Sequence, residues 1–156
     1  MINLTYDELL READSLGLVV REKSLWSSNG RLKGSKIAIR KDIATLKEKA
    51  CVLAEEIAHV ELSVGNIIDQ NIVSNRKQEY KARVLAYDKM VGLNGIIEAC
   101  EAGCTSFYMT ADYLGVTEVF LMEALESYRM KYGLCTRFDN NIIYFEPSLG
   151  VMRLYK

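Results

Sequence analysis

Three residues within one five-residue segment could together bind a metal ion and move a proton. Glu55, Glu56 and His59 belong to the segment Glu-Glu-Ile-Ala-His. On a helix, residues four apart share a face, so Glu55 and His59 can point at one site while Glu56 is rotated by about 100°. His-Glu-x-x-His zinc helices have this spacing: the first and last side chains bind zinc, and the second takes a proton from the metal-bound water. Here Glu55 stands in the first ligand position.

A further ligand has to come from another helix, and Glu79 is the candidate, twenty residues after His59. The small residue Ala82 lies one turn after Glu79, which lets two helices approach closely. A carboxylate bonds zinc at roughly 2.0 to 2.2 Å, about as short as an imidazole bond, so Glu55 does not abolish a site by geometry. Two carboxylates would neutralise the dication and weaken it as a Lewis acid, or favour an ion that prefers oxygen ligands. The alternatives are therefore zinc, another divalent metal, or none.

Each of these side chains also has an explanation without a metal. An isolated histidine on a mostly apolar helix is often a core residue, and His59 is the only histidine in the chain. Glu55 could be a solvated charge or the partner of an arginine on the next helix, and Glu56 an ordinary exposed acid. Glu79 could be an acid that the dipole stabilises near a helix N-terminus. The placement of the four groups together favours a site that includes Glu56 and His59.

The whole-chain composition narrows the class of protein. The 156 residues are 49% apolar with a net charge of -1, which suits one sizeable core. Acids and bases are interspersed, so we expect no direct nucleic-acid binding. Residues 1–8 lack the basic start and apolar run of a signal peptide, and no apolar stretch approaches the roughly 18 to 20 residues that cross a bilayer. We expect a soluble, cytoplasmic protein without a membrane partner.

The cysteines do not suggest a second metal site. We expect reduced, mostly buried thiols at all four positions, which are Cys51, Cys100, Cys104 and Cys135. Cys51 shares a helical stripe with Glu55 and His59, but eight residues of helix span about 12 Å, so Cys51 and His59 cannot share an ion. Core packing explains Cys51 better. Cys100 and Cys104 have no further Cys or His nearby.

The elements that must position these residues can be read from caps, turns and periodicity. The N-terminal elements are a helix over about 6–16, a strand at 18–21, a short antiparallel sheet within 30–40, a buried helix from Thr45 to Gly65, and a third helix over about 75–91. The C-terminal elements are a short helix over 94–102, a helix-turn-helix outline over 106–132, a hairpin over 134–146 and an extra strand within 151–155. The chain is thus α+β, with one domain over 1–103 and a second region over 104–156.

The second helix of the helix-turn-helix outline is acidic in its N-terminal half, at Glu118, Glu123 and Glu126. A DNA-reading helix presents that half to phosphates and bases, so protein recognition or structural packing is preferred. We expect the aromatic side chains of this region to form its core, namely Phe107, Tyr108, Tyr113 and Phe120.

Four segments of the chain resemble the ImmA/IrrE family of metallo-endopeptidases. They are Cys-Val-Leu-Ala-Glu-Glu-Ile-Ala-His (51–59), Val-Gly-Asn-Ile (64–67), Asn-Arg-Lys-Gln-Glu-Tyr-Lys-Ala-Arg (75–83) and Ala-x-x-Leu-Gly-Val-Thr (111–117). The resemblance extends over most of the chain and implies a zincin-like helical core. It implies that Glu56 is the general base and that His59 and Glu79 bind the metal, while Glu55 replaces the first ligand histidine. Arg83 stands where the family often has Asn or Asp, which changes the surroundings of the metal.

Family members are typically encoded by phages and mobile elements, or by bacteria that use them in stress responses. They act as antirepressors that cut or inactivate a helix-turn-helix repressor. The resemblance therefore implies a zinc-dependent endopeptidase acting on a repressor in the bacterial cytoplasm. Glu55 keeps a second hypothesis open, in which the chain is a catalytically inactive, protease-derived module that regulates a repressor by binding.

Overall fold

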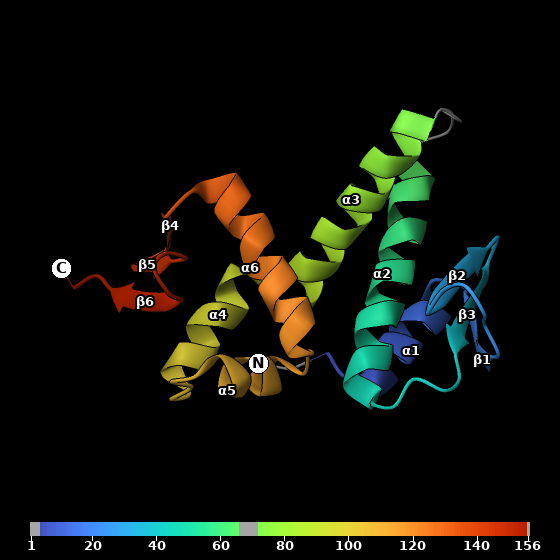
Figure 1. The fold of residues 1–156 in the computed structure, drawn as a ribbon, viewed down its shortest axis with the longest axis horizontal. Coiled ribbons are helices and arrows are strands. Elements are labelled where there is room, and N and C mark those ends of the chain that lie inside the picture. The colour runs from blue at the N-terminus through green and yellow to red at the C-terminus, as the bar shows by residue number, and fades with distance from the viewer. Residues whose placement is uncertain (1–3, 66–71, 156) are drawn as a thin grey trace. The chain divides into compact units, whose positions relative to one another are not determined.

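The computed structural model describes residues 4–65 and 72–155. Contacts divide the described chain into two compact units, Leu4–Ala86 and Tyr87–Lys156. Each unit combines helices with a three-stranded sheet, which confirms the α+β class (Figure 1). No helix among these described residues is long and apolar enough to cross a membrane.

The sheet of the first unit has strand order β1-β3-β2, built from β1 (Val19–Lys23), β2 (Gly30–Lys33) and β3 (Lys36–Arg40). β2 and β3 form an antiparallel hairpin, but β1 runs parallel to β3. The antiparallel pairing predicted within residues 30–40 is confirmed, and β1, for which no direction was predicted, joins the sheet as a parallel strand. Because β3 turns back from β2 and inserts beside β1, it runs in the same direction as β1.

Two helices cover one face of this sheet, α1 (Tyr6–Ser15) and α2 (Leu46–Gly65). The capping box predicted for α1 is confirmed: the Thr5 hydroxyl accepts the Glu8 N–H at 3.3 Å, and the Glu8 carboxylate accepts the Thr5 N–H at 2.7 Å. Thr45 begins α2 in the same way, accepting the Glu48 N–H at 3.2 Å. A stripe of α2 is fully buried, consisting of Ala50, Leu53, Ala54, Ile57 and Ala58. Packing of this stripe on the sheet and α1 fixes the direction of every other α2 side chain.

The third helix, α3 (Ile72–Met90), crosses the division between the two units. Ala82 and Ala86 on α3 are fully buried, as the small-residue argument predicted for Ala82. The next helix, α4 (Gly92–Glu101), packs on elements of the C-terminal half of the chain. For this reason the division by contacts falls within α3, whereas the sequence placed the domain boundary after residue 103.

The second unit contains the predicted helix-turn-helix, α5 (Phe107–Leu114) and α6 (Glu118–Tyr132). The Ser106 hydroxyl caps α5, Gly115 ends it with a left-handed φ of 69°, and the Thr117 hydroxyl caps α6. An antiparallel sheet follows, made of β4 (Cys135–Phe138), β5 (Asn141–Tyr144) and β6 (Gly150–Arg153). The C-terminal hairpin and the extra strand are therefore confirmed.

The aromatic core expected around this helix pair is only partly correct. Phe120 is buried, but Phe107 is 39% exposed and Tyr108 is 65% exposed. Both exposed rings lie in the first turn of α5, before the positions that pack inward, Thr110, Ala111 and Leu114. Tyr128 of α6 is also buried and lies against Phe145.

Candidate functional site

The structure brings His59 of α2 and Glu79 of α3 together within the unit Leu4–Ala86. The His59 Nε2 and Glu79 Oε2 atoms are 3.4 Å apart. Glu79 is partly exposed at the eighth position of α3, beyond the first turn, where the helix dipole has little effect. The alternative explanation of Glu79 as a helix N-terminal acid therefore loses its physical basis.

Glu56 lies on the side of α2 that packs against β2, an edge strand of the sheet. Burial, together with the smaller effects of the nearby charges of Glu55 and Glu79, raises the pKa of Glu56 from 4.5 to about 7. Burial dominates because it removes water from the ionised form. A carboxyl group with a pKa near 7 can accept a proton at neutral pH, which is the property a general base needs.

Gly30 at the start of β2 allows Glu56 to occupy this position. A Cβ atom at Gly30 would lie 2.6 Å from Glu56 Oε1 and 2.8 Å from Val52 Cγ1. The Glu56 carboxylate therefore packs against the backbone of an edge strand. The sequence predicts Gly30 at the start of the sheet within 30–40 and gives it no role in the site. The available signal was a glycine at the start of a strand, which often marks a close backbone approach.

Glu55 lies on α2 one turn before His59 and is half-buried. Its charge contributes to the raised pKa of Glu56, so Glu55 and Glu56 are electrostatically coupled. Within residues 4–65 and 72–155, no three His, Cys, Asp or Glu side chains form a group placed to hold a metal ion. Of the predicted ligands, His59 and Glu79 are the two that an explicit distance joins.

The separation of 3.4 Å between His59 Nε2 and Glu79 Oε2 suits two ligands of one tetrahedral ion. With bonds of roughly 2.0 to 2.1 Å, two tetrahedral donors lie about 3.3 to 3.4 Å apart. A charge contact between a protonated imidazole and a carboxylate would also have this length. The distance therefore fits a metal or an ion pair, and no third ligand joins His59 and Glu79 among the described residues.

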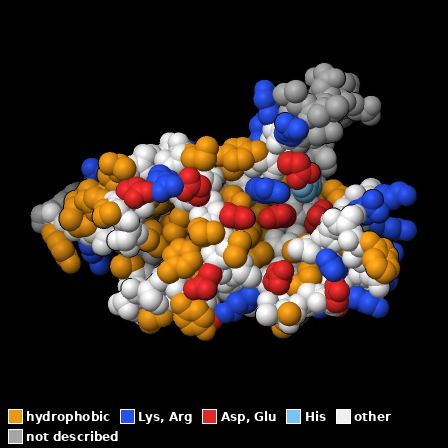
Figure 2. All heavy atoms as spheres, in the orientation of Figure 1, with side chains coloured by type: hydrophobic (Ala, Val, Ile, Leu, Met, Phe, Trp, Pro, Cys, Tyr) orange, Lys and Arg blue, Asp and Glu red, His pale blue; other side chains and the backbone are white. Residues whose placement is uncertain are grey.

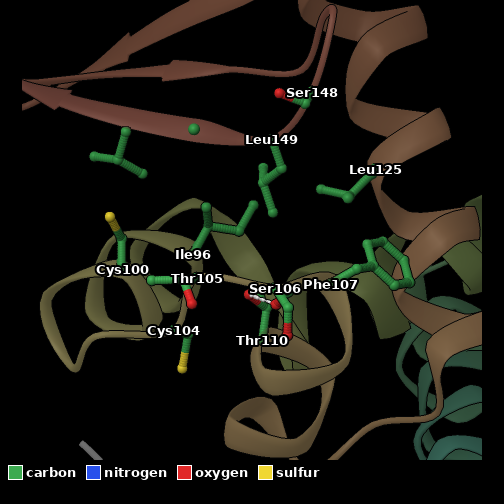
Figure 3. A pocket seen from close by; sticks show the side chains of 12 residues that line it. Ile96, Cys100, Cys104, Thr105, Ser106, Phe107, Thr110, Leu125, Ser148 and Leu149 are labelled. Carbon is green, nitrogen blue, oxygen red and sulfur yellow. Dashed lines mark hydrogen bonds between the residues drawn. The ribbon is translucent and has the colours of Figure 1, made fainter.

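No disulfide joins cysteines among the described residues, and the expectation of mostly buried thiols is correct only for Cys51. Cys100 and Cys135 are exposed, and Cys104 is intermediate. Cys100 is in the last turn of α4 and Cys104 follows Gly103, so both lie where the chain leaves the helix at the surface. In Figure 3 the two sulfur atoms point away from each other.

Cys100 and Cys104 line a pocket of about 390 Å³ within the second unit (Figure 3). Ile96, Phe107 and Leu125 contribute apolar surface to this pocket. The hydroxyl of Ser106 accepts the Met109 N–H, and the hydroxyl of Thr110 donates to the Ser106 carbonyl. Among the described residues that line the pocket none is Asp, Glu, Lys, Arg or His, so the two thiols are its titratable groups.

Comparisons with protein-family models, curated proteins and solved structures gave no match to this chain. The evidence for the function of the protein therefore comes from the geometry around Glu56, His59 and Glu79.

Proposed function

We propose that the chain is a metallo-endopeptidase-like protein of the ImmA/IrrE type that acts on, or binds, a helix-turn-helix repressor. One observation carries this proposal. His59 and Glu79, on two different helices, approach to 3.4 Å beside a half-buried Glu56 whose pKa is about 7. An ordinary surface ion pair does not require a third, half-buried carboxyl group next to it.

In this proposal His59 and Glu79 hold a divalent ion, zinc in the first instance, and Glu55 completes the site. Such an ion supplies a Lewis acid for a peptide carbonyl and a water of lowered pKa. Glu56 accepts the proton, because its raised pKa matches neutral pH. Gly30 keeps the Glu56 carboxylate against β2 and so limits its rotation.

The exposed surface of the α5 and α6 pair supports a protein partner for this unit. Tyr108, Val119 and Met122 are exposed apolar side chains, and Glu118 and Glu123 are exposed acids on the same pair of helices. Acids in the first turns of the second helix repel DNA phosphates, whereas mixed apolar and acidic surfaces suit a basic protein surface. A repressor, which binds DNA with basic residues, has such a surface.

The alternative is a protein that has lost catalysis and regulates a repressor by binding alone. The observation that favours it is Glu55 in the first ligand position, together with the absence of a preformed three-ligand group among the described residues. In that case Glu56 and Glu79 are inherited features of the helix pair, and the α5 and α6 surface carries the function.

Elemental analysis of the purified protein and cleavage of a candidate repressor separate the two hypotheses. If the protein is a peptidase, we expect about one bound divalent ion per chain, loss of most of it in His59→Ala, and at least 100-fold slower cleavage by Glu56→Gln. Glu61→Gln, the same change on an exposed α2 residue, is the matched control. The peptidase proposal would be overturned if the purified protein held no metal and if Glu56→Gln inactivated the repressor as well as the wild type does. That result would favour regulation by binding.

Glu55→His tests whether the native site is a weakened one. Restoring an imidazole at the first ligand position is expected to raise metal affinity at least tenfold and to increase metal-dependent cleavage. Unchanged metal affinity in Glu55→His would show that residue 55 is not a ligand.

A further inference from the structure

The sheet of the first unit has an outward face that is almost entirely basic. Side chains alternate between the two faces of each strand, and Ile37 and Ile39 face α1 and α2. The registers β1–β3 and β2–β3 then place eight residues on the opposite face: Val19, Arg21, Lys23, Arg31, Lys33, Lys36, Ala38 and Arg40. Six of these eight are Lys or Arg, and none is acidic.

Most of these cations have no acid partner. Arg40 pairs with Asp42 at 2.7 Å, and Glu22, which belongs to the inner face, pairs with Lys49 of α2. Within the described part of the chain, no acid pairs with the other five, which are Arg21, Lys23, Arg31, Lys33 and Lys36. All five are exposed. Figure 2 shows Lys and Arg side chains gathered over β1, β2 and β3, at the right of the view.

A groove of about 650 Å³ is lined mainly by residues of this face, and Glu22, whose carboxylate pairs with Lys49, also contributes to its lining. Its centre is a row in which Ala38 of the middle strand lies between Arg21 and Arg31 of the two edge strands. Strands are about 4.7 to 4.9 Å apart, so the two arginine Cα atoms are roughly 10 Å apart with a methyl group between them. A phosphate group placed over Ala38 can therefore be reached by a planar guanidinium from either side, the geometry in which arginine binds phosphate bidentately.

An exposed aromatic side chain lies in the β1–β2 connection, next to the basic face. Trp26 is the only tryptophan in the chain and is 96% exposed. Its neighbour Leu25 lines the groove. A tryptophan in water contributes nothing to the core, but its ring is a good platform for stacking a nucleic-acid base.

We propose that this basic face binds single-stranded nucleic acid, with phosphates on Arg21, Arg31, Lys33 and Lys36 and a base on Trp26. Cations along a groove combined with an aromatic platform are the features of sequence-tolerant single-strand sites. A duplex would bury its bases away from Trp26. An acidic peptide would use the cations but leave the indole ring without a partner.

This inference departs from the expectation drawn from the net charge. The charge of -1 is a balance between separate regions. Between Lys89 and Arg129 the sequence contains no Lys or Arg and six acids, which are Glu98, Glu101, Asp112, Glu118, Glu123 and Glu126. The charges of these acids offset those of the cations on the sheet, so the net charge of the chain does not reveal the basic face.

Fluorescence anisotropy with a labelled oligothymidylate of about 12 nucleotides tests the proposal on the full chain. We expect binding that weakens with salt, with a slope of log K against log salt of about -3, since roughly four phosphates are contacted at about -0.7 each. The double variant Arg21→Glu with Arg31→Glu is expected to bind at least tenfold more weakly. Trp26→Ala is expected to bind at least fivefold more weakly without a change in the salt slope, because it removes stacking and no charge.

The controls distinguish a built site from general charge effects. Arg11→Glu makes the same charge change as the single substitution Arg21→Glu, on an exposed residue of α1, and is expected to stay within twofold of the wild type. A duplex of the same length and polyglutamate are expected to bind at least tenfold more weakly than the oligothymidylate. Each variant is checked by circular dichroism.

Several outcomes would overturn the proposal: no binding at about 50 mM salt, equal weakening by Arg11→Glu and Arg21→Glu, or a duplex or polyglutamate bound as tightly as the single strand. Glu56→Gln should bind the oligonucleotide like the wild type. Failure of the peptidase proposal therefore leaves this one standing, and the reverse also holds.

Discussion

Glu56 is the residue at which burial and chemistry are most closely linked in this chain. Its carboxylate lies against the backbone of β2, where Gly30 leaves just enough room, and this burial raises its pKa to about 7. The helical spacing of Glu55, Glu56 and His59 was sufficient to nominate them from the sequence. Gly30 was not found, because its contact with Glu56 joins residues far apart in the chain.

Glu56→Gln is expected to make the metal-free protein more stable at high pH. The carboxyl ionises near 4.5 in the unfolded chain and near 7 in the folded one, so folding stability falls as the pH rises from 4.5 to 7. Below pH 4.5 both states are protonated and the variant should equal the wild type. Above pH 7 we expect a gain of about 2 kcal/mol, reduced from the full effect of the shift because the group is partly solvated.

Urea unfolding of the wild type and Glu56→Gln at several pH values, with a chelator present, measures this difference. A constant difference between pH 4 and pH 8 would contradict the raised pKa.

Gly30→Ala is expected to destabilise the protein by about 1 to 3 kcal/mol, because the new methyl group overlaps the Glu56 carboxylate and Val52. Gly150→Ala is the matched control, since Gly150 also begins a strand and a Cβ there meets no atom within 4 Å. Thermal unfolding compares the two variants. Equal destabilisation by both would mean that the cost comes from the strand backbone and not from the contact with Glu56.

At the scale of elements, the helices were predicted well because their signals are local. Thr5, Thr45, Ser106 and Thr117 each accept a backbone N–H at a helix start, and Gly115 ends α5 with a positive φ. The direction of β1 was not predicted, since strand pairing joins distant segments and the same alternation suits parallel and antiparallel neighbours. The candidate site is an intermediate case: its helix is predicted from local signals, but the approach of Glu79 is not.

Tyr128 connects α6 to the start of α4, and its hydroxyl is expected to be worth about 1 to 2 kcal/mol. The phenol accepts the Gly92 N–H at 3.1 Å. Burial raises the pKa of Tyr128 well above its usual value, and a hydrogen bond with Asp88 acts in the same direction. Tyr128→Phe leaves the Gly92 N–H without this acceptor and should lower stability without changing the helix content.

Chemical denaturation followed by circular dichroism tests this prediction, with Tyr155→Phe as a control because the Tyr155 ring is largely exposed. If both variants lose the same stability, the Tyr128 hydroxyl has no structural role.

At the scale of the whole molecule, composition was the least informative signal. A net charge of -1 predicted no region of one sign, yet the outward face of the first sheet is basic and the stretch from residue 90 to residue 128 contains only acids among its charged residues. Strand register creates the basic face, because it collects cations that are spaced two apart in three different strands. Net charge sums over the whole chain, so it does not reveal that the basic and acidic residues lie in different regions.

The two compact units are expected to respond separately to core substitutions. Leu53 of α2 and Leu121 of α6 are both fully buried, one in each unit, and replacing either with alanine should cost about 2 to 5 kcal/mol. We expect Leu53→Ala to reduce amide hydrogen-exchange protection mainly in residues 4–65, and Leu121→Ala mainly in residues 92–153. Equal loss of protection in both ranges for either variant would show that the chain unfolds as one cooperative body.

The burial of Cys51 determines how the opening of the site-bearing unit can be observed. The sole tryptophan is 96% exposed, so its emission changes little when the core unfolds. The other three cysteines all belong to the unit Tyr87–Lys156 and are at least partly accessible, so a thiol reagent modifies them in the native state. In a variant that keeps Cys51 and replaces those three with serine, the rate of thiol labelling then counts the openings of α2 directly. The labelling rate of Cys51 in this variant therefore reports how often the helix that holds Glu56 and His59 becomes exposed.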